Sequence, residues 1–315
     1  MAPQTPRNPF VSPRFGQIAT FMLLPAAETP AGLDVAMLGI PYDGGTSYRT
    51  GARFGPRAVR EQSSLIRPWN PVLKVHPFER LKVADCGDVD VVPISIERTH
   101  AQIEAKIDQV VAAGARPLSI GGDHSVTLPI LRALAKRHGP LALVHVDAHA
   151  DINDEMFGEP VAHGTPFRRA VEEGLLACDK VWQIGLRGTG YAADDFDWPR
   201  AQGFNVVQAH EVWYRSLAPL MGDVRERIGA RHPLYITFDI DGIDPSFAGG
   251  TGTPEIGGLT VPQALEIIRG CHGLNVVGGD LVEVAPPYDP SGNTALLGAN
   301  LLYEMLCVLP GVPRR

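Results

Sequence analysis

Short apolar runs alternate with helix-like segments along most of this chain, and this alternation limits the possible folds more than any other feature. Eight apolar runs fit strands, at residues 35–40, 81–84, 117–120, 141–146, 180–184, 205–208, 234–239 and 275–282. Segments with helical periodicity lie at residues 94–113, 128–136, 166–173, 217–228, 262–269 and 296–306. This alternation is typical of a parallel sheet, because a parallel connection has to cross back over the sheet. We expect one α/β domain with a mostly parallel eight-stranded sheet between helical layers.

A closed barrel of eight strands and eight helices shows the same alternation. The uneven spacing and the long loops favour an open sheet. Residues 1–32 carry prolines at positions 3, 6, 9, 13, 25 and 30. Such a stretch cannot form a long helix or a central strand. We expect it to be a Pro-rich arm that runs over the surface or across a neighbouring subunit, followed by a single domain at residues 33–315.

The composition excludes several classes of protein. The net charge of −7 argues against a surface for nucleic acid or anionic membranes. The longest uncharged apolar run, residues 21–27, is too short to span a bilayer. The first residues lack the apolar core of a signal peptide, and the four cysteines form no C-x-x-C pair. We expect a cytoplasmic protein whose partners include neither nucleic acid nor a membrane.

Potential metal ligands follow three of the predicted strands. They are His124, Asp147, His149, Asp151, Asp239 and Asp241. The residues after strands 141–146 and 234–239 occupy alternate positions, which point to the same side of an extended backbone. Because the carboxyl ends of parallel strands meet at one edge of a sheet, these side chains are expected to converge.

Four carboxylates and two imidazoles form an oxygen-rich set that suits Mn²⁺ better than zinc. Carboxylates can bridge two ions about 3.5–4 Å apart, leaving a shared position for a water whose pKa falls toward neutrality. A single D-x-H or D-x-D is more often a capped strand end, but three such groups are costly to bury without cations. The sequence therefore predicts a site for two divalent ions, with His145, one step inside its strand, as a core or supporting residue.

The motifs around these residues closely resemble those of the ureohydrolases, the family of arginase, agmatinase and their guanidino-acid relatives. They include G-G-D-H-S at 121–125, D-A-H-A-D at 147–151, D-I-D-G-I-D-P at 239–245, and the stretches 41–46, 51–56, 163–165, 251–254 and 283–286. The resemblance covers nearly the whole chain. It implies a three-layer α/β/α arginase-like fold with a central eight-stranded parallel sheet, a single ureohydrolase catalytic domain at 33–315, and assembly as a homotrimer or homohexamer.

The resemblance also implies a role for each site residue. Asp147 and Asp239 would bridge two Mn²⁺ ions, His124 and Asp151 would complete one coordination sphere, and His149 and Asp241 the other. His163 matches the family's mobile acid/base histidine, and Glu283 matches the carboxylate that grips the guanidinium. Hydroxide would attack the guanidinium carbon, and urea and an amine would be released. The plainer alternatives are a loop histidine for His163 and a sheet-end cap for Glu283.

The substrate is predicted less directly. The loop at 152–159, with Met156, and the stretches 268–271 and 298–303 look most like guanidinobutyrases, and Met156 could pack along an alkyl chain. No isolated arginine or lysine obviously meets a carboxylate tail, and Asp154, Glu155 and Glu159 could meet the ammonium of agmatine. The main prediction is hydrolysis of 4-guanidinobutyrate to 4-aminobutyrate and urea. The alternatives are agmatine, which gives putrescine and urea, and other guanidines or biguanides.

Two further points bear on function. A zinc-dependent deacetylase of related fold is the rival class, and it would have fewer carboxylates at its metal. The family commonly has Pro-Gly before T-G-T-P, whereas this chain has Gly249-Gly250. Loss of that proline predicts a looser loop near the pocket.

Overall fold

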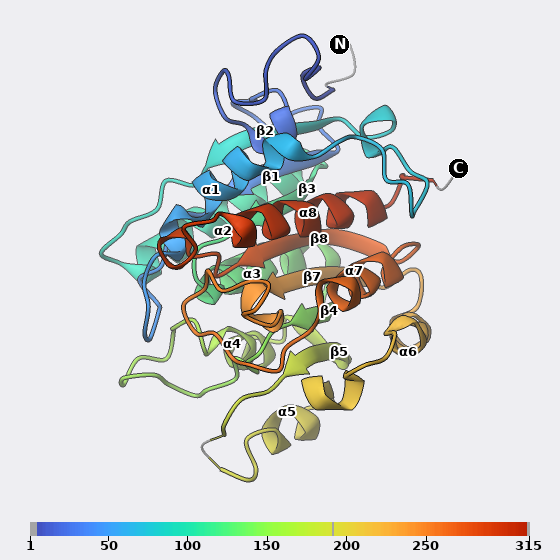
Figure 1. The fold of residues 1–315 in the computed structure, drawn as a ribbon. Helices are drawn as coiled ribbons and strands as arrows, with labels where there is room; N and C mark the ends of the chain where they lie inside the picture. Colours follow the sequence, from blue (N-terminus) through green and yellow to red (C-terminus); the bar gives the residue numbers. More distant parts are fainter. Residues whose placement is uncertain (1–4, 191, 314–315) are drawn as a thin grey trace.

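An open, all-parallel sheet forms the centre of the structure (Figure 1). The computed structural model describes residues 5–190 and 192–313. Its strands are β1 Val35–Gly39, β2 Val83–Asp88, β3 Arg116–Ile120, β4 Leu141–Val146, β5 Leu176–Leu186, β6 Asn205–Gln208, β7 Pro233–Asp239 and β8 Asn275–Val282. They follow the order β2-β1-β3-β8-β7-β4-β5-β6, and neighbours are parallel. Because β2 and β6 lie at opposite edges, the expected open sheet is confirmed and the barrel is excluded.

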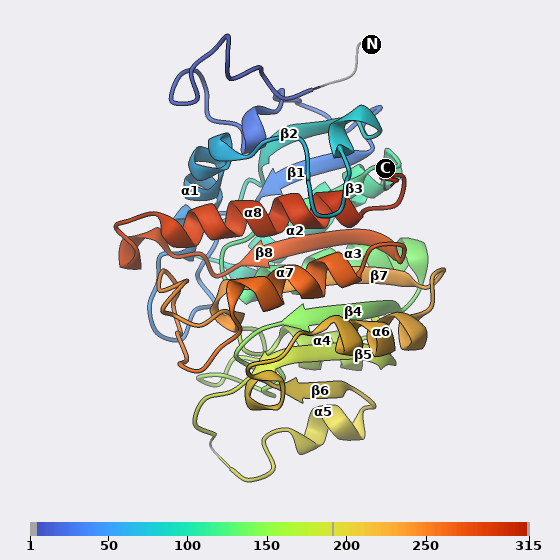
Figure 2. The same ribbon diagram turned by 45° about the vertical axis from the view of Figure 1, so that its right-hand side comes forward.

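Helices cover both faces of the sheet and make three layers (Figure 2). One face is covered by α1 Gly55–Gln62, α6 Ala218–Ile228, α7 Val261–Gly270 and α8 Asn293–Val308, and the other by α2 Ile96–Ala112, α3 Thr127–His138 and α4 Pro166–Glu172. The short α5, Asp197–Ala201, lies beside β6. One apolar core lies on each face of the sheet, so the predicted three-layer α/β/α fold is confirmed.

Short 3-10 helices connect these elements. They are η1 Phe21–Leu23, η2 Ala52–Phe54, η3 Ser63–Leu65, η4 Pro77–Glu79, η5 His124–Val126, η6 Ala209–Val212, η7 Ile240–Gly242 and η8 Pro286–Tyr288. Two of them contain predicted site residues: η5 follows β3 after three residues, and η7 follows β7 directly.

Local signals in the sequence account for several helix ends. The Ser95 side chain accepts the backbone N–H of Arg98 at the start of α2. Thr260 and Gln263 form a capping box at the start of α7, and Gly139, with φ of 77°, ends α3. The sequence does not predict α1 or α5, which have only 8 and 5 residues, because periodicity is hard to detect over so short a length.

The N-terminal arm departs from the expectation that it runs over the surface. Residues 1–4 lie outside the described part of the chain. Phe10 and Phe15 are almost fully exposed, but residues 21–24 are buried and pack against α1. The backbone N–H of Phe21 also donates to Asp85 of β2 at 2.8 Å. The expectation is wrong for residues 21–24, because this apolar run covers the core beside the β2 edge.

The sheet order decides where the site lies. The four central strands are β3, β8, β7 and β4, although they come from distant parts of the sequence. Their carboxyl ends therefore lie side by side, which is where parallel α/β sheets place their ligand sites. Within the described residues, no helix combines the length and the apolar character that crossing a bilayer requires.

Candidate active site

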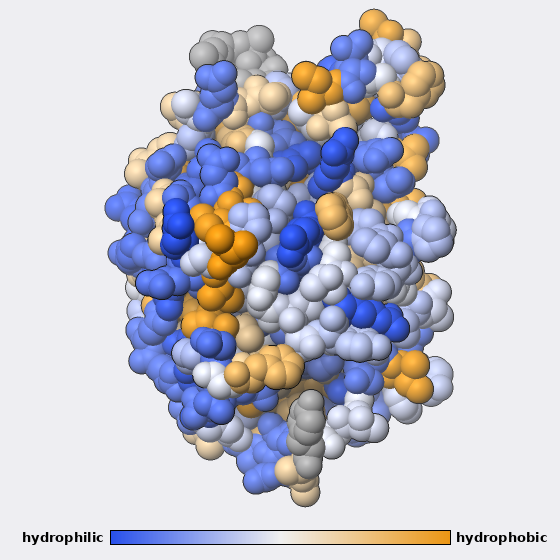
Figure 3. Space-filling model, turned by 90° about the vertical axis from the view of Figure 1, so that its left-hand side faces the viewer, coloured by the Kyte–Doolittle hydropathy of each residue, from blue (hydrophilic) through white to orange (hydrophobic). Residues whose placement is uncertain are grey.

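The six predicted ligands gather at this central edge of the sheet. His124 opens η5 after β3, Asp147, His149 and Asp151 follow β4, Asp239 ends β7, and Asp241 lies in η7. Figure 3 shows the side of the molecule toward which the strands point, where hydrophilic residues surround smaller hydrophobic patches. Four of these side chains are almost fully buried, Asp151 is about 10% exposed, and His149, at 35%, opens toward solvent.

His124 is the centre of a first group of ligands. Its Nδ1 lies 3.0 Å from Asp147 Oδ2, 3.0 Å from Asp151 Oδ2 and 3.3 Å from Asp239 Oδ2. Within the described residues, none of these contacts has the geometry of a hydrogen bond, so this buried nitrogen lacks a partner. A buried ring nitrogen that faces three carboxylate oxygens is the donor set of a divalent-metal site. These residues fit a metal ion.

A second group shares Asp147 with the first. His149 Nδ1 lies 3.3 Å from Asp241 Oδ2 and 3.5 Å from Asp147 Oδ1. Backbone groups orient the carboxylates, since Ala148 N–H donates to Asp241 at 3.1 Å and Asp241 N–H donates to Asp239 at 2.9 Å. Two groups of donors joined by one carboxylate fit a pair of ions.

The accumulated charge supports this interpretation. Burial raises the pKa of Asp239 well above its usual range, and the charges of Asp241 and Asp147 raise it further. Burial alone would lower the pKa of His124, but Asp147, Asp151 and Asp239 outweigh burial and raise the pKa of that ring well above its ordinary value. The same carboxylates that favour a charged ring would favour a bound cation. Bound cations would relieve the repulsion among these buried carboxylates.

Two predicted site residues have left-handed backbones. Asp151 has φ of 52° and Glu283 has φ of 62°. Residues with side chains adopt this region rarely, at a cost of roughly 1–3 kcal/mol, and such residues cluster at functional sites. Backbone hydrogen bonds hold both in place: Phe167 N–H donates to Asp151 at 3.1 Å, and Glu283 N–H donates to Gly122 at 2.8 Å.

Glu283 meets His163 beside the cluster. Glu283 Oε1 lies 3.0 Å from His163 Nδ1 and accepts the backbone N–H of His124 at 3.0 Å. Its other oxygen, Oε2, is buried and has no hydrogen-bond partner within the described residues. The structure therefore brings both predicted residues together and leaves one carboxylate oxygen available to a ligand.

The far side of the His163 ring contacts Ser47. His163 Nε2 lies 2.7 Å from Ser47 Oγ and accepts the backbone N–H of Ser47 at 3.1 Å. Burial and this backbone N–H favour the neutral ring. Glu283, and then Asp151 and Asp123, outweigh burial and raise the pKa of His163 to about 9. The carboxylates around the ring therefore favour its charged form.

Met156 lies in the loop that follows Asp151. It pairs with Glu159 through two backbone hydrogen bonds of 2.9 Å, which close the loop after Asp151. A Cβ atom built on Gly164 would lie 2.7 Å from Met156 Sδ, so the thioether packs against the residue after His163. Asp154, in the same loop, pairs with Arg169 at 2.7 Å.

Tertiary contacts surround the second glycine of the Gly249-Gly250 pair. Gly250 is buried, its N–H donates to Thr294 Oγ1 at 3.0 Å, and its carbonyl accepts from Ala285 N–H at 2.7 Å. A Cβ atom there would lie 2.7 Å from the side chain of Asp289. The lost proline falls at position 249 rather than at Gly250, so the looser loop expected from its loss stays a prediction.

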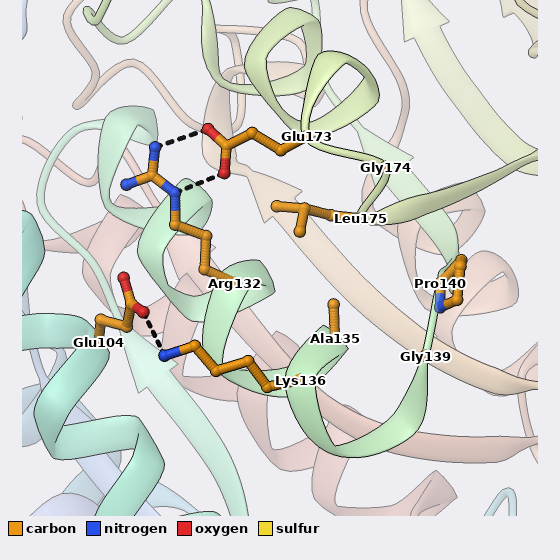
Figure 4. A pocket seen from close by; sticks show the side chains of 9 residues that line it. All are labelled: Glu104, Arg132, Ala135, Lys136, Gly139, Pro140, Glu173, Gly174 and Leu175. Carbon is orange, nitrogen blue, oxygen red and sulfur yellow. Dashed lines mark hydrogen bonds and ion pairs between the residues drawn. The ribbon is translucent and has the colours of Figure 1, made fainter.

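A separate cavity of about 450 Å³ lies at the amino-terminal ends of the strands, beside the residues that precede β4 and β5 (Figure 4). Its charged side chains pair with one another: Arg132 bonds Glu173 at 2.7 Å, and Lys136 bonds Glu104. The predicted ligands are absent from its lining. The candidate site is instead the cluster of predicted ligands, where His124 Nδ1 and Glu283 Oε2 are buried and have no hydrogen-bond partner in the described part of the chain.

Sequence reasoning missed Ser47 and Arg187. Arg187 N–H donates to Ala148 O at 2.9 Å, and its guanidinium donates to Asp241 O at 2.6 Å. It thus ties together the loops that follow β4 and β7. Its position just after strand 180–184 was the available signal, because charged residues at the carboxyl ends of parallel strands are often functional.

The fold and the cluster define an α/β protein whose central strand ends carry metal-ligand residues. The chain belongs to the arginase family, whose model matches residues 33–307.

Similar proteins agree with this assignment. The guanidinobutyrase of Pseudomonas aeruginosa is 61% identical over 306 residues, covering 96% of each chain. The mitochondrial agmatinase of Gallus gallus is 56% identical over 307 residues, covering 98% of this chain and 90% of that one. The solved structure of proclavaminate amidino hydrolase from Streptomyces clavuligerus has a TM-score of 0.88 and 42% identity, covering 94% of this chain and 99% of that one.

Proposed function

We propose that this protein hydrolyses a guanidino compound to urea and an amine, and that its main substrate is 4-guanidinobutyrate, which gives 4-aminobutyrate. The observation that carries the proposal is Glu283 Oε2, a buried carboxylate oxygen without a partner among the described residues, beside His163 and the ligand cluster. A planar guanidinium pairs well with such a carboxylate. Membership of the arginase family supports the same reaction.

The cofactor is proposed to be two Mn²⁺ ions. Asp147 and Asp239 would be shared between them, His124 and Asp151 would complete one set of ligands, and His149 and Asp241 the other. Oxygen-rich ligands support manganese over zinc. When bound, the pair supplies a nucleophile at neutral pH by lowering the pKa of water.

The protein's own residues then have defined tasks. Glu283 binds the guanidinium and aims its carbon at the cluster. The raised pKa of His163 favours a protonated ring, which can give a proton to the amine that leaves. Ser47 holds the ring through Nε2 at 2.7 Å. Asp151 would act as one of the metal ligands in the same cluster.

One contact in the structure supports 4-guanidinobutyrate over agmatine. Asp154 already pairs with Arg169 at 2.7 Å, which weakens it as a partner for an ammonium tail. Met156 lies beside His163, where an apolar side chain would line the alkyl chain of either substrate. The 61% identical relative is named a guanidinobutyrase. Agmatinase activity is the second candidate, since a 56% identical relative has that name.

The remaining proposals concern organisation. We propose a cytoplasmic homotrimer or homohexamer, with residues 33–315 as the catalytic domain and residues 1–32 as an arm. Phe10 and Phe15 of the arm are 97% and 95% exposed, which supports contact with another copy. Light scattering after gel filtration measures the assembly, and a monomer would contradict it.

A urea-release assay on manganese-loaded protein tests the reaction. The panel is arginine, agmatine, 3-guanidinopropionate, 4-guanidinobutyrate and a biguanide. The highest kcat/KM is expected for 4-guanidinobutyrate, and a preference for agmatine would select the second candidate. No urea from any compound would overturn the proposed reaction. One metal ion per chain by elemental analysis would favour the zinc deacetylase class instead.

A further inference from the structure

A row of polar side chains crosses the apolar sheet beneath the candidate metal site. Strand register places Gln183 of β5 beside His145 of β4, His145 beside Thr237 of β7, and Thr237 beside Asp280 of β8. All four are fully buried. His145 and Thr237 precede Asp147 and Asp239 by two residues, so they lie on the same face of their strands. Buried polar groups in a central sheet call for an explanation.

Gln183 determines which ring nitrogen of His145 carries the proton. Its Nε2 donates to the carbonyl of Ala150 at 2.7 Å, which identifies that atom as the amide nitrogen. The same Nε2 lies 3.0 Å from His145 Nδ1, so Nδ1 must accept. The ring proton is then on Nε2, which lies 2.8 Å from Asp147 Oδ2 and donates to it. Both nitrogens of His145 are engaged, which makes it a support for Asp147 rather than a ligand.

Thr237, which lies beside Asp280 in the sheet, contacts the ring of His124. Asp280 Oδ2 accepts the hydroxyls of Thr127 and Tyr235, each at 2.8 Å. Thr237 is the register neighbour of Asp280, and its Oγ1 lies 2.9 Å from His124 Nε2. Because His124 Nδ1 faces the carboxylate oxygens of the ligand cluster, we assign the ring proton to Nε2, which donates to Thr237. His124 Nδ1 is then the nitrogen free to bind a cation.

We propose that this row is the positioning apparatus of the site, in which the relays Gln183–His145–Asp147 and Thr237–His124 fix the donor atoms offered to metal. The inference rests on the proposed two-ion site. Phe167 holds both rings from one side, with its centroid 4.2 Å from that of His145 and 5.2 Å from that of His124. Removing such supporting hydrogen bonds lowers metal affinity about 10- to 100-fold in other metalloproteins.

The test compares near-isosteric variants titrated with manganese chloride. Thr237→Val and Gln183→Met each remove one relay and nearly preserve volume, whereas Thr237→Ser retains the hydroxyl. Calorimetry is expected to give at least about tenfold weaker binding for the first two, and binding within about threefold of wild type for Thr237→Ser. Melting of the metal-free proteins reports whether the fold itself has changed.

Gln263→Met is the matched control. Gln263 is also buried and also donates to backbone carbonyls, those of Val212 and Arg215, but it caps α7 away from the site. Unchanged affinity in Thr237→Val and Gln183→Met would overturn the inference, as would an equal loss in Gln263→Met. If wild-type protein binds no manganese, the proposed two-ion site fails instead.

Discussion

Glu283 Oε1 lies 3.0 Å from His163 Nδ1, and the same oxygen accepts the backbone N–H of His124. One carboxylate oxygen thus joins the proposed proton donor to the loop that carries a proposed metal ligand. The second oxygen is buried and has no hydrogen-bond partner within the described residues. Because Glu283 is held at φ of 62°, the contact depends on a strained backbone as well as on charge.

Replacing Glu283 with glutamine tests this arrangement. Gln keeps the size of the side chain but removes the charge that would bind a guanidinium. Loss of charge-assisted hydrogen bonds, worth about 1.5–3 kcal/mol each, is expected to lower kcat/KM for 4-guanidinobutyrate by about 100-fold or more. Urea release measures the effect, and metal content should stay that of wild type. A loss smaller than about fivefold would remove Glu283 from the substrate site.

The raised pKa of His163 predicts a dependence of stability on pH. The pKa rises from 6.5 to about 9 on folding, so the charged ring stabilises the fold fully below pH 6.5. That stabilisation, on the order of 3 kcal/mol, is lost as pH rises through about 9. Urea unfolding of metal-free protein from pH 6 to 10 is expected to show a steeper loss for wild type than for His163→Asn. Equal slopes in the two proteins would contradict the raised pKa.

The sequence predicts the eight strands and the six ligand-type residues because both signals are local. Apolar runs identify strands, and alternate spacing after β4 and β7 places carboxylates and imidazoles on one side. The order β3-β8-β7-β4, which makes the site possible, depends on how distant segments pair. The spacing of residues along the chain does not predict this order.

Other features of the site depend on packing and were not predictable from residue spacing. The left-handed backbones of Asp151 and Glu283 are held by tertiary hydrogen bonds, and residue type does not predict them, since aspartate adopts this conformation only occasionally and glutamate rarely. His145 and Thr237 look like single polar interruptions of apolar strands, and only the register joins them to Gln183. The burial of residues 21–24 was not predicted, because the prolines around them indicate an irregular surface segment.

Asp239→Asn is expected to have opposite effects with and without metal. Burial, Asp241 and Asp147 together raise the pKa of Asp239, so removing its charge relieves repulsion, and the metal-free variant should melt above metal-free wild type. Manganese at 100 times its Kd should stabilise wild type by about 2.7 kcal/mol per site, and the variant much less. Thermal melts with EDTA or with manganese measure both effects. A variant that gains as much from manganese as wild type would exclude Asp239 as a ligand.

Two glycine-to-alanine changes test how tightly the loop before His124 is packed. A Cβ atom on Gly122 would lie 1.6 Å from the carbonyl oxygen of Tyr42, and this backbone cannot move without shifting the loop. Gly122→Ala is therefore expected to cost at least about 3 kcal/mol of unfolding free energy and to weaken manganese binding. Gly222, inside α6, has open space where its Cβ would lie, so Gly222→Ala should stabilise by about 0.5–1 kcal/mol. Urea unfolding of both variants gives the comparison, and similar stabilities would show that the close approach of Gly122 to Tyr42 is not required.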